Sequence, residues 1–184
     1  YCNTIATQSC FSSMIGGCCN TLSSSCRSSI IAGAYNNINR SSFTSIIGGD
    51  GQCISFSSCN TSILGGLTNS ICSSSCDSSV IGGTLNVINY CSRESSIVGG
   101  ISNHIYHNDC GSVILGGLTN LTNCDTTNTI NSGYLNKIKF SGESSILGGY
   151  KNCIYGYSSV YKNKRSAIIG GMYNSICHND CGSV

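Results

Sequence analysis

Cysteine is the residue type whose number and spacing point most directly to chemistry in this chain. The 184 residues include 15 cysteines, and so high a density is typical of proteins from oxidising, extracellular environments. Six cysteines stand two residues before a new copy of a sequence repeat: Cys10, Cys26, Cys59, Cys76, Cys110 and Cys181. With no C-x-x-C pair to hold zinc, this spacing predicts structural disulfides rather than a metal site.

Two disulfide schemes fit the spacing. The first joins equivalent positions of neighbouring coils, which lie near 5 Å apart in a stacked repeat: Cys10 with Cys26, and Cys59 with Cys76. The second joins two cysteines of one loop: Cys72 with Cys76, and Cys177 with Cys181. The sequence leaves this choice open. Because 15 is an odd number, at least one thiol stays free or pairs outside this chain.

A second candidate for chemistry is a segment in which tyrosines and cations gather. One repeat is about five residues longer than the others, and its extra residues fall in 155–165. Insertions in solenoids form surface loops and often carry binding. The candidate binding residues are Tyr155, Tyr157, Tyr161, Lys162, Lys164 and Arg165. They suggest a loop that holds a host-surface glycan or an anionic surface, and the alternative is a solvated bulge without a ligand.

The acidic residues and histidines do not favour catalysis. Asp and Glu together number seven, whereas glycoside hydrolysis needs paired carboxylates about 5 to 9.5 Å apart. Asp77 and Glu94 occupy equivalent positions of neighbouring coils, but we interpret them as solvated turn residues. His107 and His178 each precede Asn-Asp-Cys, where an Asx turn is a simpler interpretation than a metal site. We therefore predict that the protein is not an enzyme and has neither a metal nor a cofactor.

A sequence repeat that covers the whole chain must position these residues. Its copies start at Ser12, Ser28, Thr44, Thr61, Ser78, Ser95, Ser112, Asn128, Ser144 and Ser166. Steps of 16 or 17 residues, with a last step of 22, are too short for a helix hairpin of about 33 residues. We predict an all-β protein, a β-solenoid (β-roll) of about ten 16–17-residue coils, which at about 4.8 Å per coil is roughly 50 Å long.

Four columns of the repeat have a structural interpretation, counting the start residue as position one. Gly-Gly at positions five and six permits positive φ at a sharp corner. Apolar residues at positions three, four and eleven favour strands. Position nine can form a ladder of stacked amides, and its asparagines are Asn20, Asn36, Asn69, Asn86, Asn103, Asn120, Asn136, Asn152 and Asn174. Gln52 takes this position once.

The first strand of each coil is apolar on both sides. Positions three and four are consecutive apolar residues, as in Ile30-Ile31 and Val80-Ile81, and neighbouring residues of a strand point to opposite faces. One row fills the core, so the other forms an apolar stripe of the kind that marks interfaces. We predict that the stripe packs against identical copies, most simply in a homotrimer. The alternatives are a thick monomeric coil that encloses both rows, and a lateral two-chain contact.

The composition of the chain argues against nucleic-acid and membrane partners. Only 9% of the residues are charged and the net charge is +2, so no nucleic-acid partner is expected. No apolar run approaches the length of a membrane span, so we expect no membrane insertion. The chain begins and ends within a repeat. We therefore interpret residues 1–184 as a single repeat array taken from a longer solenoid, with 155–165 as an inserted surface loop.

The block Ser-x-Ile-Ile-Gly-Gly-x-x-Asn-x-Ile resembles the head repeats of trimeric autotransporter adhesins, the YadA-like head family. Related repeats occur in phage and other viral fibre proteins. The resemblance covers residues 12–184 and is clearest in 29–33 and 79–83. In that family three chains pack as left-handed β-rolls, with repeats nearer 14 residues that lack cysteine. The resemblance implies a surface fibre or an adhesin.

These observations lead to one functional prediction and two alternatives. We predict a structural segment, shaft or head, of an extended, disulfide-reinforced fibre on the surface of a cell or virion. The first alternative is a glycan-binding adhesin head that uses the 155–165 loop. The second is an ice-binding or surface-tiling solenoid, although ice binding would need a regular threonine column that the repeat lacks.

Overall fold

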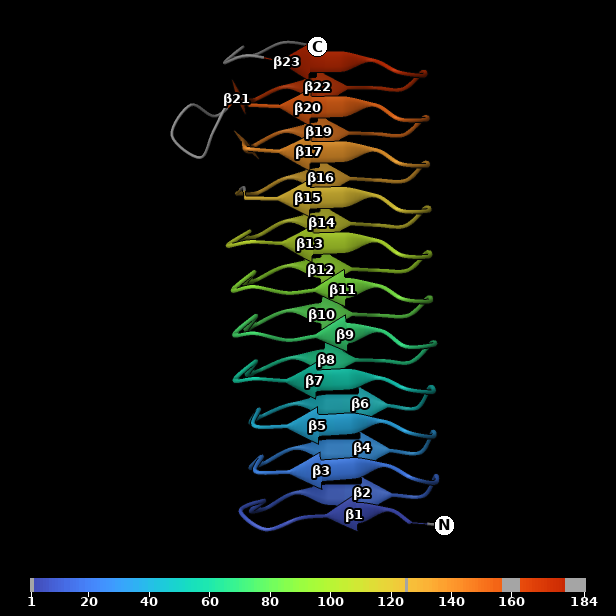
Figure 1. Cartoon of the computed structure of the whole chain (residues 1–184), viewed down its shortest axis with the longest axis vertical. Helices are drawn as coiled ribbons and strands as arrows, with labels where there is room; N and C mark the ends of the chain where they lie inside the picture. The colour runs from blue at the N-terminus through green and yellow to red at the C-terminus, as the bar shows by residue number, and fades with distance from the viewer. Residues whose placement is uncertain (1, 125, 157–162, 178–184) are drawn as a thin grey trace.

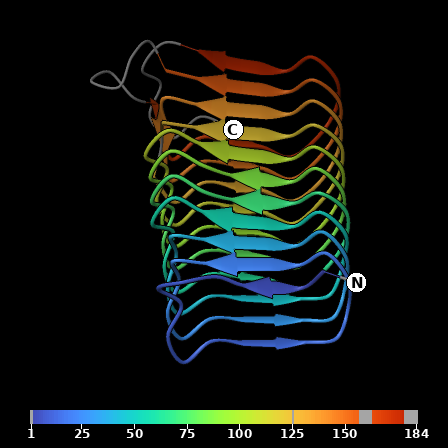
Figure 2. The same cartoon turned by 60° about the horizontal axis from the view of Figure 1, so that its bottom comes forward.

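The computed structural model describes residues 2–124, 126–156 and 163–177. Every regular element in these ranges is a β-strand, and the strands wind into a solenoid of about nine turns (Figure 1). The predicted all-β solenoid is therefore confirmed. Each coil has two strands, which belong to two facing parallel sheets that run the length of the rod (Figure 2).

Sheet A collects the second strand of each coil and sheet B collects the first. Sheet A contains eleven strands: β1 (Thr4–Ile5), β3 (Thr21–Ser23), β5 (Asn37–Asn39), β7 (Cys53–Ser55), β9 (Ser70–Ile71), β11 (Val87–Ile88), β13 (His104–Tyr106), β15 (Leu121–Asn123), β17 (Lys137–Lys139), β20 (Cys153–Tyr155) and β23 (Ser175–Cys177). Sheet B contains ten: β2 (Ser13–Ile15), β4 (Ser29–Ile31), β6 (Ser45–Ile47), β8 (Ser62–Ile63), β10 (Ser79–Val80), β12 (Ser96–Ile97), β14 (Val113–Ile114), β16 (Thr129–Ile130), β19 (Ser145–Ile146) and β22 (Ala167–Ile168). A small third sheet pairs β18 (Ser141–Gly142) with β21 (Asn163–Lys164).

The register of both sheets follows the sequence repeat. Each residue pairs with its equivalent in the next coil, as Ile30 does with Ile46 and Val80 with Ile97. The long repeat keeps this register, because Ser145 of β19 pairs with Ala167 of β22. Each position of the coil therefore forms a straight column parallel to the rod axis.

The core is a narrow seam between the two sheets. It is built from position three of sheet B and position eleven of sheet A, and eighteen Ile, Leu and Val residues in these columns are 0% to 9% exposed. Thr122 takes position eleven in β15 and is also buried. Because each coil contributes only one or two apolar side chains, hydrogen bonds between coils must supply much of the internal order.

The second glycine of each Gly-Gly pair is required by the stacking. Gly83 has a φ of +87°, and a Cβ at this position would lie 2.2 Å from the carbonyl oxygen of Gly100. It would also lie 2.5 Å from Nδ2 of Asn86. No side chain fits between the corners of adjacent coils, so the glycine lets the corners approach closely.

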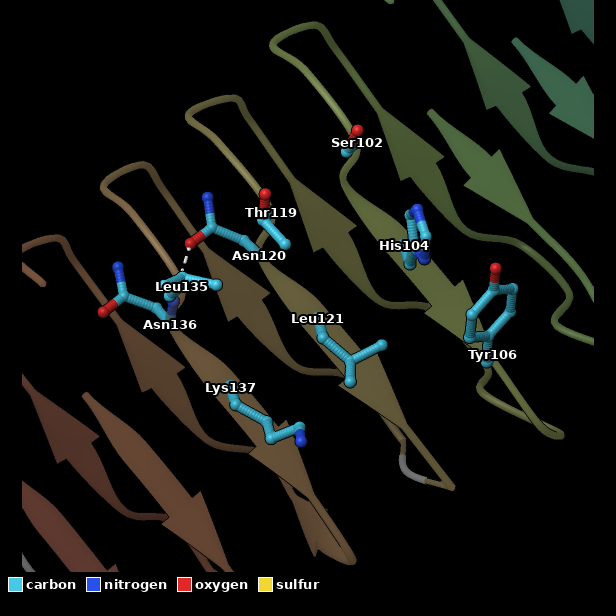
Figure 3. A pocket seen from close by; sticks show the side chains of 9 residues that line it. All are labelled: Ser102, His104, Tyr106, Thr119, Asn120, Leu121, Leu135, Asn136 and Lys137. Atoms are coloured by element: carbon cyan, nitrogen blue, oxygen red, sulfur yellow. Dashed lines mark hydrogen bonds between the residues drawn. The ribbon is translucent and has the colours of Figure 1, made fainter. Parts of the chain in front are cut away.

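The asparagine column bonds each coil to the next through the backbone. Oδ1 of Asn103 accepts a hydrogen bond from the backbone N–H of Asn120 at 3.0 Å. Its Nδ2 donates to the carbonyl oxygens of Gly99 and Gly117 at 3.0 and 3.1 Å. The predicted amide-to-amide stacking is thus replaced by amide-to-backbone bonds. Figure 3 shows one such bond, from Asn136 to Asn120.

Two further polar ladders run beside the asparagine ladder. In one, a serine hydroxyl accepts from the backbone N–H of the serine one coil later, as Ser58 does from Ser75 and Ser75 from Ser92, both at 3.2 Å. The other follows the repeat starts, as when Ser95 accepts from Ser112 at 3.2 Å. These side chains are buried, so side-chain bonds add to the backbone bonds between neighbouring coils.

We expect Asn103→Ala to destabilise the solenoid strongly. The substitution removes three hydrogen bonds at a fully buried site and leaves the N–H of Asn120 without its partner. The free energy of unfolding should fall by about 2 to 4 kcal/mol, measured by urea denaturation. Asn131→Ala, at a half-exposed position outside the ladder and without a positive φ, is the matched control and should change it by less than about 0.5 kcal/mol. Equal effects of the two changes would contradict the ladder's role.

Candidate functional site

The outer face of sheet B carries the apolar stripe that the sequence predicted. We define the apolar stripe as the position-four residues Ile15, Ile31, Ile47, Leu64, Ile81, Val98, Leu115, Leu147 and Ile169. Their exposed fractions lie between 38% and 68%. Because the strands stack in register, these side chains form one line along the rod, interrupted at Asn131. A single coil therefore does not enclose both apolar rows, and the alternative of a thick monomeric coil is wrong.

A column of bare glycine lies beside the apolar stripe. This first-glycine column is position five: Gly16, Gly48, Gly65, Gly82, Gly99, Gly116, Gly148 and Gly170. A Cβ added at Gly82, Gly99 or Gly116 would meet no atom within 4 Å, and none of the three has a positive φ. Ala32 and Ser132 take the same position, so the fold accepts a side chain there. At Gly16, Gly48 and Gly65 a positive φ already favours glycine. At Gly82, Gly99, Gly116 and Gly170 the single chain gives no steric reason for it.

A second exposed apolar column follows the Gly-Gly corner. Its larger members at position seven are Leu67, Ile101, Leu118, Tyr134 and Met172, with exposed fractions of 38% to 68%. Asp50 is the one charged residue among positions four, five and seven of the described coils. The corner is therefore a ridge of glycine backbone with apolar side chains on both flanks, and Figure 1 shows it as the right-hand edge of the rod.

The structure stacks the cysteines of the first disulfide scheme in neighbouring coils. The backbone N–H of Cys10 points at Sγ of Cys26 at 3.4 Å, and that of Cys59 at Sγ of Cys76 at 3.1 Å. The hydrogen bond with the Cys26 thiol and the charge on that group raise the pKa of Cys10. All fourteen described cysteines are free thiols, so disulfide formation stays a prediction.

The other predicted cysteines lie in different surroundings. The column neighbours of Cys110 are Arg93 and Thr126 rather than cysteines, and Cys181 lies outside the described residues. Cys177 is the last residue of β23, and Cys72 directly follows β9 at the same position of its coil. Each lies near a cysteine of the preceding coil. Burial raises the pKa of Cys53, and the nearby Cys72 thiol raises it further. Burial and Cys177 do the same for Cys153. Sequence spacing missed these diagonal neighbours.

The structure describes only part of the predicted binding loop. Tyr155 lies in β20 with its ring 5.9 Å from that of Phe140, and Nζ of Lys139 lies 5.9 Å from the Tyr155 ring centroid. Arg165 forms an ion pair with Glu143 at 2.9 Å. Lys164 belongs to β21. Tyr157, Tyr161 and Lys162 lie outside the described residues, so a shared binding surface stays a prediction.

A shallow groove of about 260 Å³ lies on the outer face of sheet A. Figure 3 shows His104, Leu121 and Lys137 side by side on successive strands, with Tyr106 beyond His104 on β13. The ring centroids of His104 and Tyr106 are 5.1 Å apart. Burial lowers the pKa of His104, so the imidazole is neutral near pH 7. The groove is lined by apolar side chains together with Ser102, Thr119 and the His104 imidazole.

The comparisons with known proteins add no family to this picture. No protein-family model matches the chain, and no curated protein matches it either. The fold itself places the chain among β-solenoid repeat proteins, an architecture that repeat fibre proteins can have. Among the residues that the structure describes, no three His, Cys, Asp or Glu side chains gather into a possible metal site. That part of the chain also has no helix long and apolar enough to cross a membrane.

The stability of the protein should decrease in mildly acidic solution because of His104. Burial holds the folded-state pKa of His104 below its ordinary value of 6.5, so the unfolded chain binds more protons below that pH. The stabilising contribution of the neutral ring is complete above about pH 6.5 and is lost as the pH falls towards the folded-state pKa. Urea denaturation at pH 7.5 and pH 5 would measure this loss. His104→Gln should show a smaller loss than the wild type, and an unchanged loss would contradict the assignment.

Proposed function

We propose that this chain is a structural segment of an extended fibre on the surface of a cell or virion, assembled as a homotrimer. The observation that carries the proposal is the first-glycine column beside the apolar stripe. At Gly82, Gly99, Gly116 and Gly170 glycine occupies a position where the single chain has room for a side chain and no positive φ requires glycine. A neighbouring backbone that approaches this ridge closely would supply the missing reason.

The stripe favours a second copy of the same chain as the partner. One apolar residue per coil gives the surface a period of about 4.8 Å. A partner must repeat at the same spacing over the length of the rod to match it. Another solenoid of the same rise does so automatically. The near absence of charge among the described residues of this face lets identical surfaces meet without repulsion between like charges.

The shape of the corner favours three copies. The apolar stripe and the position-seven column lie on opposite flanks of the glycine ridge. If the ridge points at a threefold axis, one flank of each chain contacts one neighbour and the other flank contacts the other neighbour. Such head-to-tail contacts close into a ring, and bare glycine permits the three backbones to come near the axis.

The remaining features suit a mechanical role outside the cell. The three polar ladders and the strand pairing all run parallel to the rod. An internal coil can therefore unfold only by breaking its hydrogen bonds to both neighbouring coils. Cysteines one coil apart can add covalent links in an oxidising environment. We propose no catalytic activity and no cofactor for the chain.

The trimer is tested by filling the first-glycine column. The wild-type chain should have three times the 19.2 kDa mass of one copy in native mass spectrometry and light scattering, with and without reductant. The triple variant Gly82→Val, Gly99→Val and Gly116→Val should fold, because its side chains enter open space, but should be monomeric. The matched control, Ser70→Val with Asn89→Val on the outer face of sheet A, should remain trimeric.

Two outcomes would overturn the trimer. A monomeric wild-type chain would remove self-association and favour a single-chain solenoid that tiles or binds through its flat face. A trimeric triple variant with an unchanged circular dichroism melting curve would place the interface elsewhere on the rod. A triple variant that fails to fold would contradict the open space assigned to the first-glycine column.

Disulfide reinforcement is tested by oxidation. Oxidised glutathione should convert the Cys10–Cys26 and Cys59–Cys76 thiol pairs to disulfides, each pair losing two electrons and two protons as the glutathione is reduced to two thiols. Peptide mapping by mass spectrometry should show both links. Each closes a loop of 16 or 17 residues and should stabilise the fold by about 3 kcal/mol, a gain that Cys10→Ser with Cys59→Ser should abolish. A Cys72–Cys76 link would favour the second scheme instead.

A further inference from the structure

In three neighbouring stretches of the rod, the loop after the sheet A strand carries an aromatic ring at the same position. Phe56, Tyr90 and His107 occupy the same position in their coils and have φ values of 56°, 56° and 59°. Ser73 takes this position in the coil between Phe56 and Tyr90, also with a φ of 56°. Equal backbone geometry makes the side chains leave the loop in the same direction. This ring column lies on the side of the rod opposite the Gly-Gly corner, the left-hand edge in Figure 1.

The backbones of these loops are hydrogen-bonded from coil to coil. The carbonyl oxygen of Phe56 accepts from the N–H of Ser74 at 2.9 Å, and that of Ser73 from Cys91 at 2.8 Å. The ring of Tyr90 then stacks on that of His107 with centroids 4.8 Å apart and planes 6° apart. Coil spacing and ring spacing are therefore the same in this column.

Ser73 interrupts the ring column and leaves a slot. Phe56 and Tyr90 are two coils apart, so their side chains leave the loops about 9 to 10 Å apart along the axis. A shallow, open groove runs along this part of the loop face. Its lining residues are Phe56, Ser73, Ser74, Tyr90, Cys91, His107 and Asn108. Phe56 and Tyr90 are 57% and 51% exposed, so both walls are accessible to a ligand.

We propose that this slot binds an uncharged pyranose ring between Phe56 and Tyr90. A sugar ring midway between Phe56 and Tyr90 would lie about one coil spacing, about 4.8 Å, from each of them. A pyranose ring with hydrogens on both faces fits that space, and its hydroxyls suit the serine side chains of the groove, which an aromatic hydrocarbon ring could not bond. Aromatic faces offer the apolar surface on which the C–H groups of a sugar rest.

The polar groups of the slot fit the rest of a sugar. Ser73 and Ser74 line the groove, and their hydroxyls can exchange hydrogen bonds with sugar hydroxyls. No carboxylate, lysine or arginine lines the groove, which favours a neutral sugar over a charged one. The site does not depend on the proposed trimer, and its position away from the Gly-Gly corner keeps it open when copies assemble.

The slot is tested with methyl β-galactopyranoside and methyl β-glucopyranoside as probes, by saturation-transfer NMR on the whole chain. At roughly 20 mM, sites of millimolar Kd are well occupied, and the wild type should transfer saturation to the sugar ring protons. Ser73→Phe supplies the missing ring and should weaken binding at least about tenfold. Tyr90→Ser removes one wall and should weaken it about tenfold. Phe43→Ser, which removes an exposed ring elsewhere, should bind as the wild type does.

The results that would overturn the proposal are equally specific. If the wild-type protein transfers saturation to neither sugar, a pyranose in the slot is excluded. Equal saturation transfer from the wild type and from Ser73→Phe would exclude it as well. Binding of indole without binding of either pyranoside would show that the slot takes flat aromatic groups instead. Circular dichroism melting checks that Ser73→Phe is folded, and Tyr90→Ser tests the same slot if that variant is not.

Discussion

Stacking in register along one axis is the constraint on which this structure depends. Every residue lies over its own equivalent about 4.8 Å away, so a buried polar group finds its partners within its own coil or in the coil directly above or below. Asn and Ser satisfy this condition because each can accept from the backbone N–H above while donating elsewhere, as Asn103 does. Columns of one charge would repel at that spacing, which explains an interior of amides and hydroxyls.

The sequence predicted the parts of the fold that depend on a repeated residue type. Ile at positions three and eleven and Asn at position nine recur at fixed spacing, so the strands, the thin core and the asparagine column followed from counting. The serine ladders did not, because serine is common at exposed positions too and Ser75 looks no different from its neighbour Ser74. Only the coordinates show that Ser75 is buried and bonded to Ser92.

The candidate sites were predictable to different degrees for the same reason. Consecutive isoleucines were enough to predict the apolar stripe. The two glycines of a pair look alike in sequence, yet Gly83 is held by its neighbours while Gly82 faces open space. Cys53 and Cys72 are 19 residues apart, which is no multiple of the repeat, so their diagonal proximity was missed. The slot at Ser73 is a gap in a column, and a gap is visible only once the rings on both sides are placed.

The coil divides into a fixed side and a variable side. From position one to position eleven the spacing is the same in every repeat, because the glycine corner and the asparagine ladder leave no room for an extra residue. All the variation between 16, 17 and 22 residues falls in the loop after sheet A. An assembly interface needs a surface that repeats without error, and the corner supplies it. Ligand contacts need irregularity, so the loop side is where a break such as Ser73 can act as a site without disturbing the ladders.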